Sequence, residues 1–282
     1  MQDSRAFWRH PRFHDLGLMK ARFTRHRYER HTHPTYVIAL ITSGAERVGL
    51  GNRTVVAPAG SMLVVNPEEV HDGEAAVDGG WAYRTFYPSV LLLNAVGGEL
   101  GQDGPPLFPR TVIEDPGLAL AVAAAHEGST SIEVESAEAS LLLALRGLIL
   151  RHSNRRTWRE PVEPSGAARR LALYRHVVER DIASTIDLQR LAALAGVTRF
   201  QVIRDFKKET GLTPATFIRN RRLRRASHLI AEGSSLADAA LQAGFADQSH
   251  FSRSFQSVHG ITPGLFRAGW LGRGPARKRT SS

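Results

Sequence analysis

The chain has 282 residues, of which 42% are apolar, carries a net charge of +10 and contains no cysteine. This length allows one large domain or two ordinary ones, and the apolar content excludes a globally disordered chain. The lack of cysteine excludes a disulfide framework and fits a reducing cytoplasm.

Membrane insertion is not expected. The longest apolar stretches are Val37–Ile41, Leu118–Ala125 and Leu141–Leu145, and a membrane span needs about 18 apolar residues. The first ten residues carry charges where a signal peptide has an apolar core. We therefore expect a soluble, cytoplasmic protein without a membrane partner.

The charge is unevenly distributed along the chain. Residues 1–164 hold 17 Lys and Arg against 19 Asp and Glu, whereas residues 165–282 hold 20 against 8. A near-neutral front half and a basic back half predict two domains, of which the second meets a polyanion.

Residues 30–90 are expected to form short strands separated by turns. Turn residues recur about every 8–12 positions, as in small barrels and sandwiches. The expected strands are Tyr36–Thr42, Glu46–Leu50, Arg53–Ala57, Ser61–Val65 and Trp81–Tyr87. Ser43-Gly44 is expected to end the first of them.

Three histidines stand out in this region: His31, His33 and His71. Side chains at i and i+2 of a strand point to the same face, so His31 and His33 can enter one interior. A few polar groups in an apolar cavity suit a small polar effector. The predicted effector-pocket residues are His31, His33, Tyr36, Asn66, His71, Tyr83 and Arg84.

The stretches "HTHPTY" (His31 to Tyr36) and "GSMLVVNP" (Gly60 to Pro67), with Gly44 and His71, resemble the cupin barrel over about residues 20–90. Metal-binding cupins add a glutamate four or five residues after the His-x-His pair, and this chain has Val37 and Ile38 there. Three histidines could still bind zinc or iron, and they could also be purely structural. We predict the effector pocket, with no metal and no cofactor.

Residues 115–152 have the apolar pattern of helices, which could pack on the barrel or pair two subunits. The following polar stretch, His152 to Gly166, contains two prolines and is expected to be a linker. The predicted domains are 1–152 for ligand binding and dimerisation, 153–166 for the linker and 167–269 for DNA binding. Residues 270–282 are expected to be a disordered basic tail.

The back half contains one pattern twice. Gly196 and Gly244 lie 48 residues apart, and Phe206 and Phe255 lie 49 apart, as do the two Thr-Pro pairs that begin at Thr213 and Thr262. Each copy has a capped helix, a glycine stop and a second capped helix. Two helices joined by a tight glycine turn form the helix-turn-helix of many DNA readers. A helix from Thr213 to Ala231, with "RNRRLRR" on it, is expected to join the copies.

The second helix of each copy is expected to carry donors for phosphates and base edges. From the pattern, the predicted DNA-binding residues are Arg199, Gln201, Arg204 and Lys207 in the first copy, and Gln248, Ser249, His250, Ser252 and Arg253 in the second. Phe206, Phe217, Phe255 and Phe266 are expected in the core.

Residues 168–268 resemble the DNA-binding domain of the AraC/XylS family of bacterial transcription regulators. The matching stretches are "LAALAGVT", "RDFKKETGLTP", "RLRRA", "ALQAGFADQSHFSRSF" and "GITP". The resemblance implies recognition helices at about 198–208 and 247–257 that reach successive major grooves of double-stranded DNA. It adds Phe200 and Ile203 to the predicted DNA-binding residues, as residues that face bases, although Ile203 could equally be a core residue. It also implies a cupin-type ligand-binding half whose helices dimerise the protein, and contact with RNA polymerase if the protein is an activator.

We therefore predict an α+β protein, with a cupin-like β-barrel and appended helices followed by an all-α domain with two helix-turn-helix motifs. Its predicted function is effector-responsive, sequence-specific transcription regulation, without enzymatic activity. The first alternative is a metal-dependent cupin enzyme with a nucleic-acid-binding appendage. The second is a DNA-packaging protein without sequence preference, in which Arg253 would matter equally on all DNA.

Overall fold

The structure, a computed structural model, describes residues 2–130, 134–154 and 163–272. Its contacts divide the described residues into two compact units: the first takes in most of residues 2–154 together with 268–272, and the second takes in residues 28–31 and 163–267. Most of the expected linker and nearly all of the expected basic tail lie outside the described residues. No helix in the described ranges is long and apolar enough to cross a membrane.

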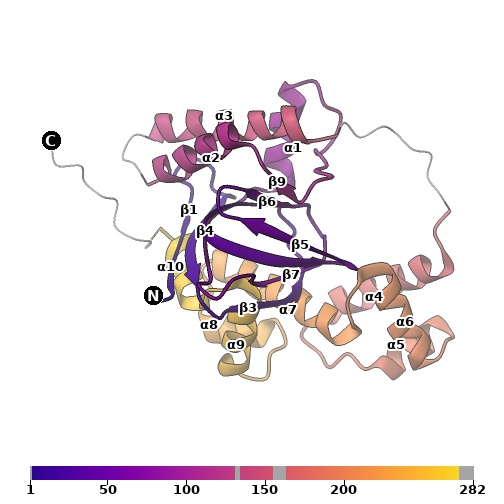
Figure 1. The fold of residues 1–282 in the computed structure, drawn as a ribbon. Helices are drawn as coiled ribbons and strands as arrows, with labels where there is room; N and C mark the ends of the chain where they lie inside the picture. Colours follow the sequence, from indigo (N-terminus) through magenta and orange to yellow (C-terminus); the bar gives the residue numbers. More distant parts are fainter. Residues whose placement is uncertain (1, 131–133, 155–162, 273–282) are drawn as a thin grey trace. The chain divides into compact units, whose positions relative to one another are not determined.

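The first unit is built on a nine-stranded antiparallel sheet that rolls up without closing into a ring (Figure 1). The hydrogen-bonded order is β1-β2-β8-β4-β6-β9, with β5 and β7 paired to β4, and β3 paired to β7. The strands are β1 (Ser4–Arg9), β2 (Gly17–Phe23), β3 (Arg27–His31), β4 (Val37–Leu50), β5 (Arg53–Pro58), β6 (Met62–Val65), β7 (His71–Ala75), β8 (Trp81–Tyr87) and β9 (Val112–Ile113).

Strand β4 corrects one expectation of the sequence. Ser43-Gly44 does not end a strand, because β4 continues for 14 residues and shifts register between Ile41 and Ser43. Gly44 has a φ of 67°, and a Cβ there would lie 1.9 Å from the Gly80 carbonyl oxygen. The bulge bends one strand from one layer of the sheet into the other, so a turn is not needed.

Three helices cover one face of the sheet: α1 (Val90–Glu99), α2 (Pro116–Gly128) and α3 (Val134–His152). Ile38, Leu40, Val64 and Phe86 of the sheet share one buried cluster with Leu141, Leu145 and Leu148 of α3. The opposite face of the strands lines the interior. The alternation of β8 therefore sends Phe86 to the helices and Tyr83, Thr85 and Tyr87 inward.

The second unit is helical. Its elements are α4 (Gly166–Arg180), α5 (Leu188–Ala195), α6 (Arg199–Thr210), α7 (Pro214–Ala231), α8 (Leu236–Gln242), α9 (Gln248–His259) and α10 (Pro263–Trp270). The pairs α5–α6 and α8–α9 are the two helix-turn-helix motifs, and α7 joins them, so the predicted architecture is confirmed (Figure 1).

Candidate nucleic-acid interface and effector site

Helix α6 presents a largely polar face because Val202 and Phe206 are buried on its other side. The Thr198 hydroxyl caps the helix by accepting a hydrogen bond from the Gln201 backbone N–H at 3.2 Å. Val202 and Phe206 are fully buried, and the Phe206 ring stacks on Tyr174 at 5.5 Å between ring centroids. Four of the predicted DNA-binding residues are exposed: Arg199, Phe200, Arg204 and Lys207.

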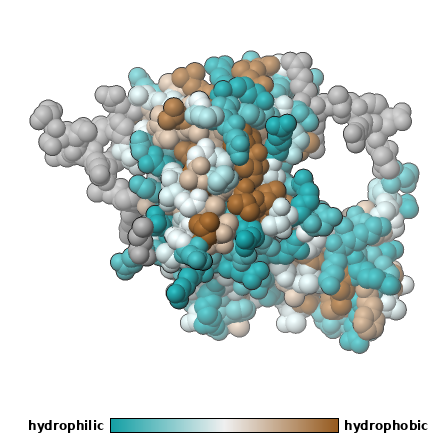
Figure 2. All heavy atoms as spheres, in the orientation of Figure 1, coloured by the Kyte–Doolittle hydropathy of each residue, from teal (hydrophilic) through white to brown (hydrophobic). Residues whose placement is uncertain are grey.

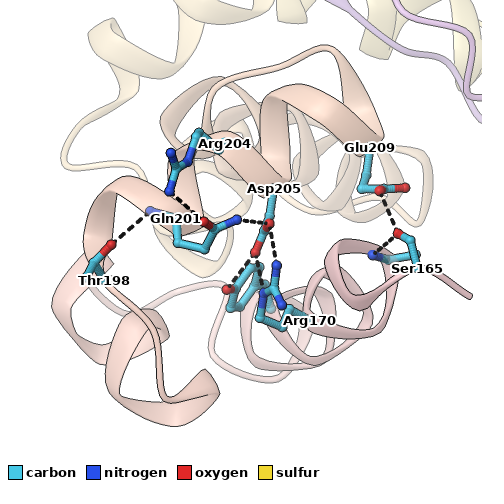
Figure 3. Close-up of polar contacts among 9 residues, drawn as sticks. Ser165, Arg170, Thr198, Gln201, Arg204, Asp205 and Glu209 are labelled. Atoms are coloured by element: carbon cyan, nitrogen blue, oxygen red, sulfur yellow. Dashed lines mark hydrogen bonds and ion pairs between the residues drawn. The ribbon is translucent and has the colours of Figure 1, made fainter.

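A buried carboxylate fixes this helix to α4 (Figure 3). Arg170 donates two hydrogen bonds to Asp205, from Nε at 2.7 Å and from Nη2 at 2.8 Å, and the Tyr174 hydroxyl donates a third at 3.2 Å. The Arg170 hydrogen bonds hold the pKa of Asp205 below its usual range. Because Asp205 is 1% exposed, this ion pair is shielded from solvent on the carboxylate side.

The same network reaches the outer face of α6. Gln201 donates to Asp205 at 2.7 Å and accepts from Arg204 at 2.6 Å. Arg204 is exposed, so the network positions a guanidinium at the surface without covering it. Gln201 therefore holds its neighbour in place in this structure, which the sequence did not indicate.

Helix α9 repeats the arrangement. Asp247 caps it by accepting from the His250 backbone N–H at 2.7 Å, and that bond holds the Asp247 pKa below its usual range. Phe251 and Phe255 are fully buried and meet edge to face at 5.5 Å. The exposed predicted residues are Gln248, Ser249, His250 and Arg253, whereas Ser252 is half-buried, as Ile203 is in the first motif.

The two motifs are joined through the loop after α4. Arg222 of α7 donates to the carbonyl oxygens of Ile182 and Ser184 at 3.0 and 2.8 Å. Gly244 turns between α8 and α9 with a φ of 84°, and a Cβ there would lie 2.6 Å from the Ile182 oxygen. Arg222, part of the basic run, thus bonds to backbone oxygens within the protein. No local pattern marks these long-range partners.

In the first unit, the predicted pocket residues separate into two groups. Tyr36 donates to the Pro106 carbonyl oxygen at 2.7 Å, and Asn66 exchanges two 2.9 Å hydrogen bonds with the Phe108 backbone. Arg84 pairs with Glu127 of α2 at 2.6 Å. These three side chains brace loops and helices, whereas Tyr83, His33 and His71 belong to the inner side.

The three histidines lie together. His31, His33 and His71 each have a ring nitrogen within 4.8 Å of those of the other two. Nδ1 of His31 lies 2.7 Å from the Glu29 carbonyl oxygen, and Nδ1 of His71 lies 2.9 Å from that of Glu69. A donated Nδ1–H would leave Nε2 as the lone-pair nitrogen, the arrangement seen in metal-ligating histidines. Burial lowers the pKa of His71, so its imidazole is neutral at pH 7.

Two family profiles match the chain. The AraC-like ligand binding domain matches residues 14–146, and a helix-turn-helix domain matches residues 191–269. Among curated proteins, the chain is 26% identical over 227 residues to the HTH-type transcriptional regulator YbfI of Bacillus subtilis (strain 168), covering 79% of this chain and 81% of that protein.

Other relatives match over a similar length. The HTH-type transcriptional activator RhaR of Cronobacter sakazakii is 24% identical over 267 residues, covering 88% of this chain and 90% of that protein. Among solved structures, ToxT from Vibrio cholerae, bound to an unsaturated fatty acid, superposes with a TM-score of 0.56 at 14% identity, covering 98% and 97% of the two chains. At this identity the likeness to ToxT is one of fold.

Proposed function

Because the chain is an AraC/XylS-family transcription regulator with an AraC-like ligand-binding domain and a helix-turn-helix domain, we propose that α6 and α9 together read one DNA site. Each helix enters a major groove, and the two grooves lie about one helical turn apart. Arg204 and Arg253 read base edges. Arg199, Lys207 and the donors at the start of α9 hold phosphates.

The observation that carries this proposal is the matched pair of exposed polar faces. Both helices start at a capping side chain, bury two large apolar residues and leave an arginine exposed at an equivalent place, Arg204 and Arg253. Phe200 is 76% exposed at the start of α6, where a thymine methyl group would give it an apolar partner.

The finer parts of the function are proposals as well. The front domain, residues 1–152, binds a small effector and pairs two subunits, and the protein acts in the cytoplasm without enzymatic activity. The fatty acid bound to ToxT supports a small organic ligand in this fold. The name of RhaR, a transcriptional activator, supports activation through contact with RNA polymerase. Effector binding changes DNA affinity only if it favours one arrangement of the dimer.

The first test is selection of genomic DNA fragments by the purified full-length protein at near-physiological salt, followed by sequencing. We expect an enriched motif with two blocks about one helical turn apart. An absence of enrichment, both with the protein alone and with cell extract as a source of effector, would contradict sequence-specific reading.

Arg253 gives the sharper test. Arg253→Ala should cost about 1–3 kcal/mol on the selected site and little on random DNA. Arg253→Lys keeps the charge but loses the bidentate geometry, so it should bind random DNA as the wild type does and still bind the selected site more weakly. Equal losses of Arg253→Ala on both DNAs would favour a packaging protein.

The three-histidine group supports a second candidate, a metal-dependent cupin enzyme with a nucleic-acid-binding appendage. Three imidazoles that leave a further coordination position for water or substrate form a set of ligands suited to zinc or iron. Metal analysis of the purified protein tests it. Stoichiometric zinc or iron that is lost in both His31→Ala and His71→Ala would support this candidate, and metal-free wild-type protein would remove it.

A further inference from the structure

A buried acidic side chain of the first unit has no counterpart in the function described so far. Glu46 lies in the second half of β4 and is 6% exposed. From Glu46 onward the burial of β4 alternates: Glu46, Val48 and Leu50 are buried, while Arg47 is exposed. Leu50 is paired with His71 of β7, and directly paired residues share a face of a sheet. Glu46 therefore points into the interior, on the same face as His71.

The Glu46 carboxyl group has no hydrogen-bonding or ion-pair partner in the described part of the chain. It accepts no hydrogen bond there, and its cross-strand neighbours, Ala57 and Ala75, are too small and apolar to cover it. Burial without a partner raises the pKa of Glu46 to about 8. Buried carboxyl groups almost always have a charged or hydrogen-bonding partner in the protein, so this one calls for an explanation.

In the described part of the chain, no arginine pairs with Glu46. Arg5, on the inner face of β1, pairs with Asp3, whereas Arg22 and Arg84 lie on the helix side of the sheet and bond to Ser43 and Glu127. Arg47 lies on the opposite face of β4 and pairs with Glu74. The interior thus contains a carboxyl group that has no cationic partner among the described residues, and a bound cation would favour its ionised form.

The groups that share the interior with Glu46 are aromatic and polar. Burial, and after it the charge of Glu46, raises the pKa of the Tyr87 hydroxyl. The His33 ring lies between Tyr87 and His71, at 5.7 and 5.2 Å from their rings. Trp81 and Tyr83 stack at 6.5 Å on the same face of β8. The Trp81 Nε1 and Thr85 Oγ1 atoms are buried without a hydrogen-bond partner in the described part.

We propose that Glu46 is the anionic anchor of the effector site, and that the effector is a small organic cation, an amine or guanidine, held by Glu46 beside the aromatic side chains of β8. This inference rests on the proposed effector-sensing function and gives it a ligand class. A carboxylate beside aromatic faces suits a cation, through a charge-assisted hydrogen bond and cation–π attraction. The unpaired Thr85 and Trp81 groups provide further polar contacts, and an anionic ligand would be repelled.

A metal ion is the competing cation. The group of side chains close enough to share a metal contains the three histidines and not Glu46. Glu46 therefore does not complete that donor set, and its charge is free to serve an organic ligand. EDTA in the experiment removes free metal ions, so any response in its presence comes from the organic cation and not from a metal.

The test is thermal unfolding of the full-length protein at pH 7.5, with EDTA, in the presence of two matched probe sets. One set is phenethylamine, 2-phenylethanol and 3-phenylpropionate, and the other is 1,4-diaminobutane, 1,4-butanediol and succinate. We expect at least one amine to raise the Tm of the wild type, while its neutral and anionic counterparts do not.

Glu46→Gln keeps the shape and the hydrogen bonding but removes the charge, so it should bind that amine at least roughly tenfold more weakly. Glu74→Gln is the matched control, since Glu74 lies on the neighbouring strand and pairs outward with Arg47. It should respond as the wild type does.

Three results would overturn the proposal: no response to either amine, a stronger response to an anionic or neutral probe, or an unchanged amine affinity in Glu46→Gln. DNA selection with the same wild-type protein reports on the regulator function separately. An enriched motif without an amine response would remove this ligand class alone, and amine binding without a motif would remove DNA reading alone.

Discussion

Two buried carboxyl groups in this protein have opposite surroundings. Asp205 is surrounded by donors from Arg170, Tyr174 and Gln201, and the Arg170 hydrogen bonds hold its pKa low. Glu46 has no such donor among the described residues, and burial raises its pKa to about 8. One group therefore stabilises the fold as an anion, and the other opposes folding once it is charged.

Replacing Asp205 by alanine should lower the free energy of unfolding by about 2–4 kcal/mol at pH 7, because it leaves Arg170 without its buried partner. The folded-state pKa is depressed, so the contribution of Asp205 is present above its unfolded pKa near 4 and is lost as the pH falls through the folded value. Urea unfolding at pH 7 and pH 3 measures this. Glu209→Gln, on the same helix but bonded only to Ser165 in an exposed position, should have little effect. A loss that is independent of pH would contradict the ion-pair explanation.

Glu46→Gln should have the reverse dependence. The folded-state pKa lies above the unfolded value, so the folded protein keeps a proton that the unfolded chain releases between about pH 4.5 and 8. The cost of the buried charge grows over that window at about 1.4 kcal/mol per pH unit. Unfolding curves of both proteins at pH 5, 7 and 9 should coincide at pH 5 and separate in favour of Glu46→Gln by a few kcal/mol at pH 9. If the two proteins differed in unfolding free energy by the same amount at all three pH values, Glu46 would already be charged and solvated at pH 5.

At the scale of elements, the two helix-turn-helix motifs use equivalent glycines in different surroundings. Gly196 and Gly244 have φ values of 63° and 84°, which favour glycine at both turns. A Cβ at Gly196 would meet nothing within 4 Å, whereas at Gly244 it would lie 2.6 Å from the Ile182 oxygen and 2.9 Å from the Ala183 Cα. The second motif is therefore packed against the loop after α4, and the first turn is open.

Gly196→Ala should accordingly cost about 1–2 kcal/mol of stability, the price of a left-handed residue with a side chain. Gly244→Ala should cost more, because the backbone of the neighbouring loop must also move. Comparing urea midpoints of the two variants isolates the packing contribution, since the backbone strain is common to both. Equal urea midpoints for the two variants would show that the loop after α4 moves aside at little cost in stability.

At the scale of the whole molecule, the helices of the first unit expose apolar side chains. Leu91, Leu120, Leu143 and Leu150, on α1, α2 and α3, are 63–79% exposed, and Figure 2 shows hydrophobic surface on the part of the molecule that carries α2 and α3. Leu143 and Leu150 are seven residues apart on α3 and so lie on one face. Such a face is suited to pairing with a second copy of the chain.

If α3 pairs the subunits, the double variant Leu143→Glu, Leu150→Glu should sediment as a monomer where the wild type sediments as a dimer. It should also bind a site with two half-sites more weakly, because the two DNA-binding domains are no longer linked. Leu194→Glu, in the second unit at 51% exposure, is the control and should leave the oligomeric state unchanged. Wild-type protein that is monomeric at micromolar concentration would contradict the proposed role of α3.

Local signals explain which features the sequence predicts well. The caps at Thr198 and Asp247, the glycine turns and the Thr-Pro starts are properties of a few adjacent residues, and all of them appear in the structure. The sequence does not predict helix α1, because Gly97 and Gly98 weaken its helical pattern. The fused strand β4 was also missed, because Ser43-Gly44 forms a bulge only when Gly80 lies against it.

By itself, the sequence determined that a strand-rich front half precedes two helix-turn-helix motifs on a basic back half, since periodicity, capping and charge act over short distances along the chain. The tertiary structure decided which polar side chains form hydrogen bonds within the protein and which can still bind a ligand or DNA. Gln201 and Arg222 bond internally, Arg253 stays exposed, and Glu46 is buried without a partner in the described part of the chain. The physical reason is that burial and pairing depend on residues tens of positions away, such as Asp205 beside Arg170, which no local pattern brings together.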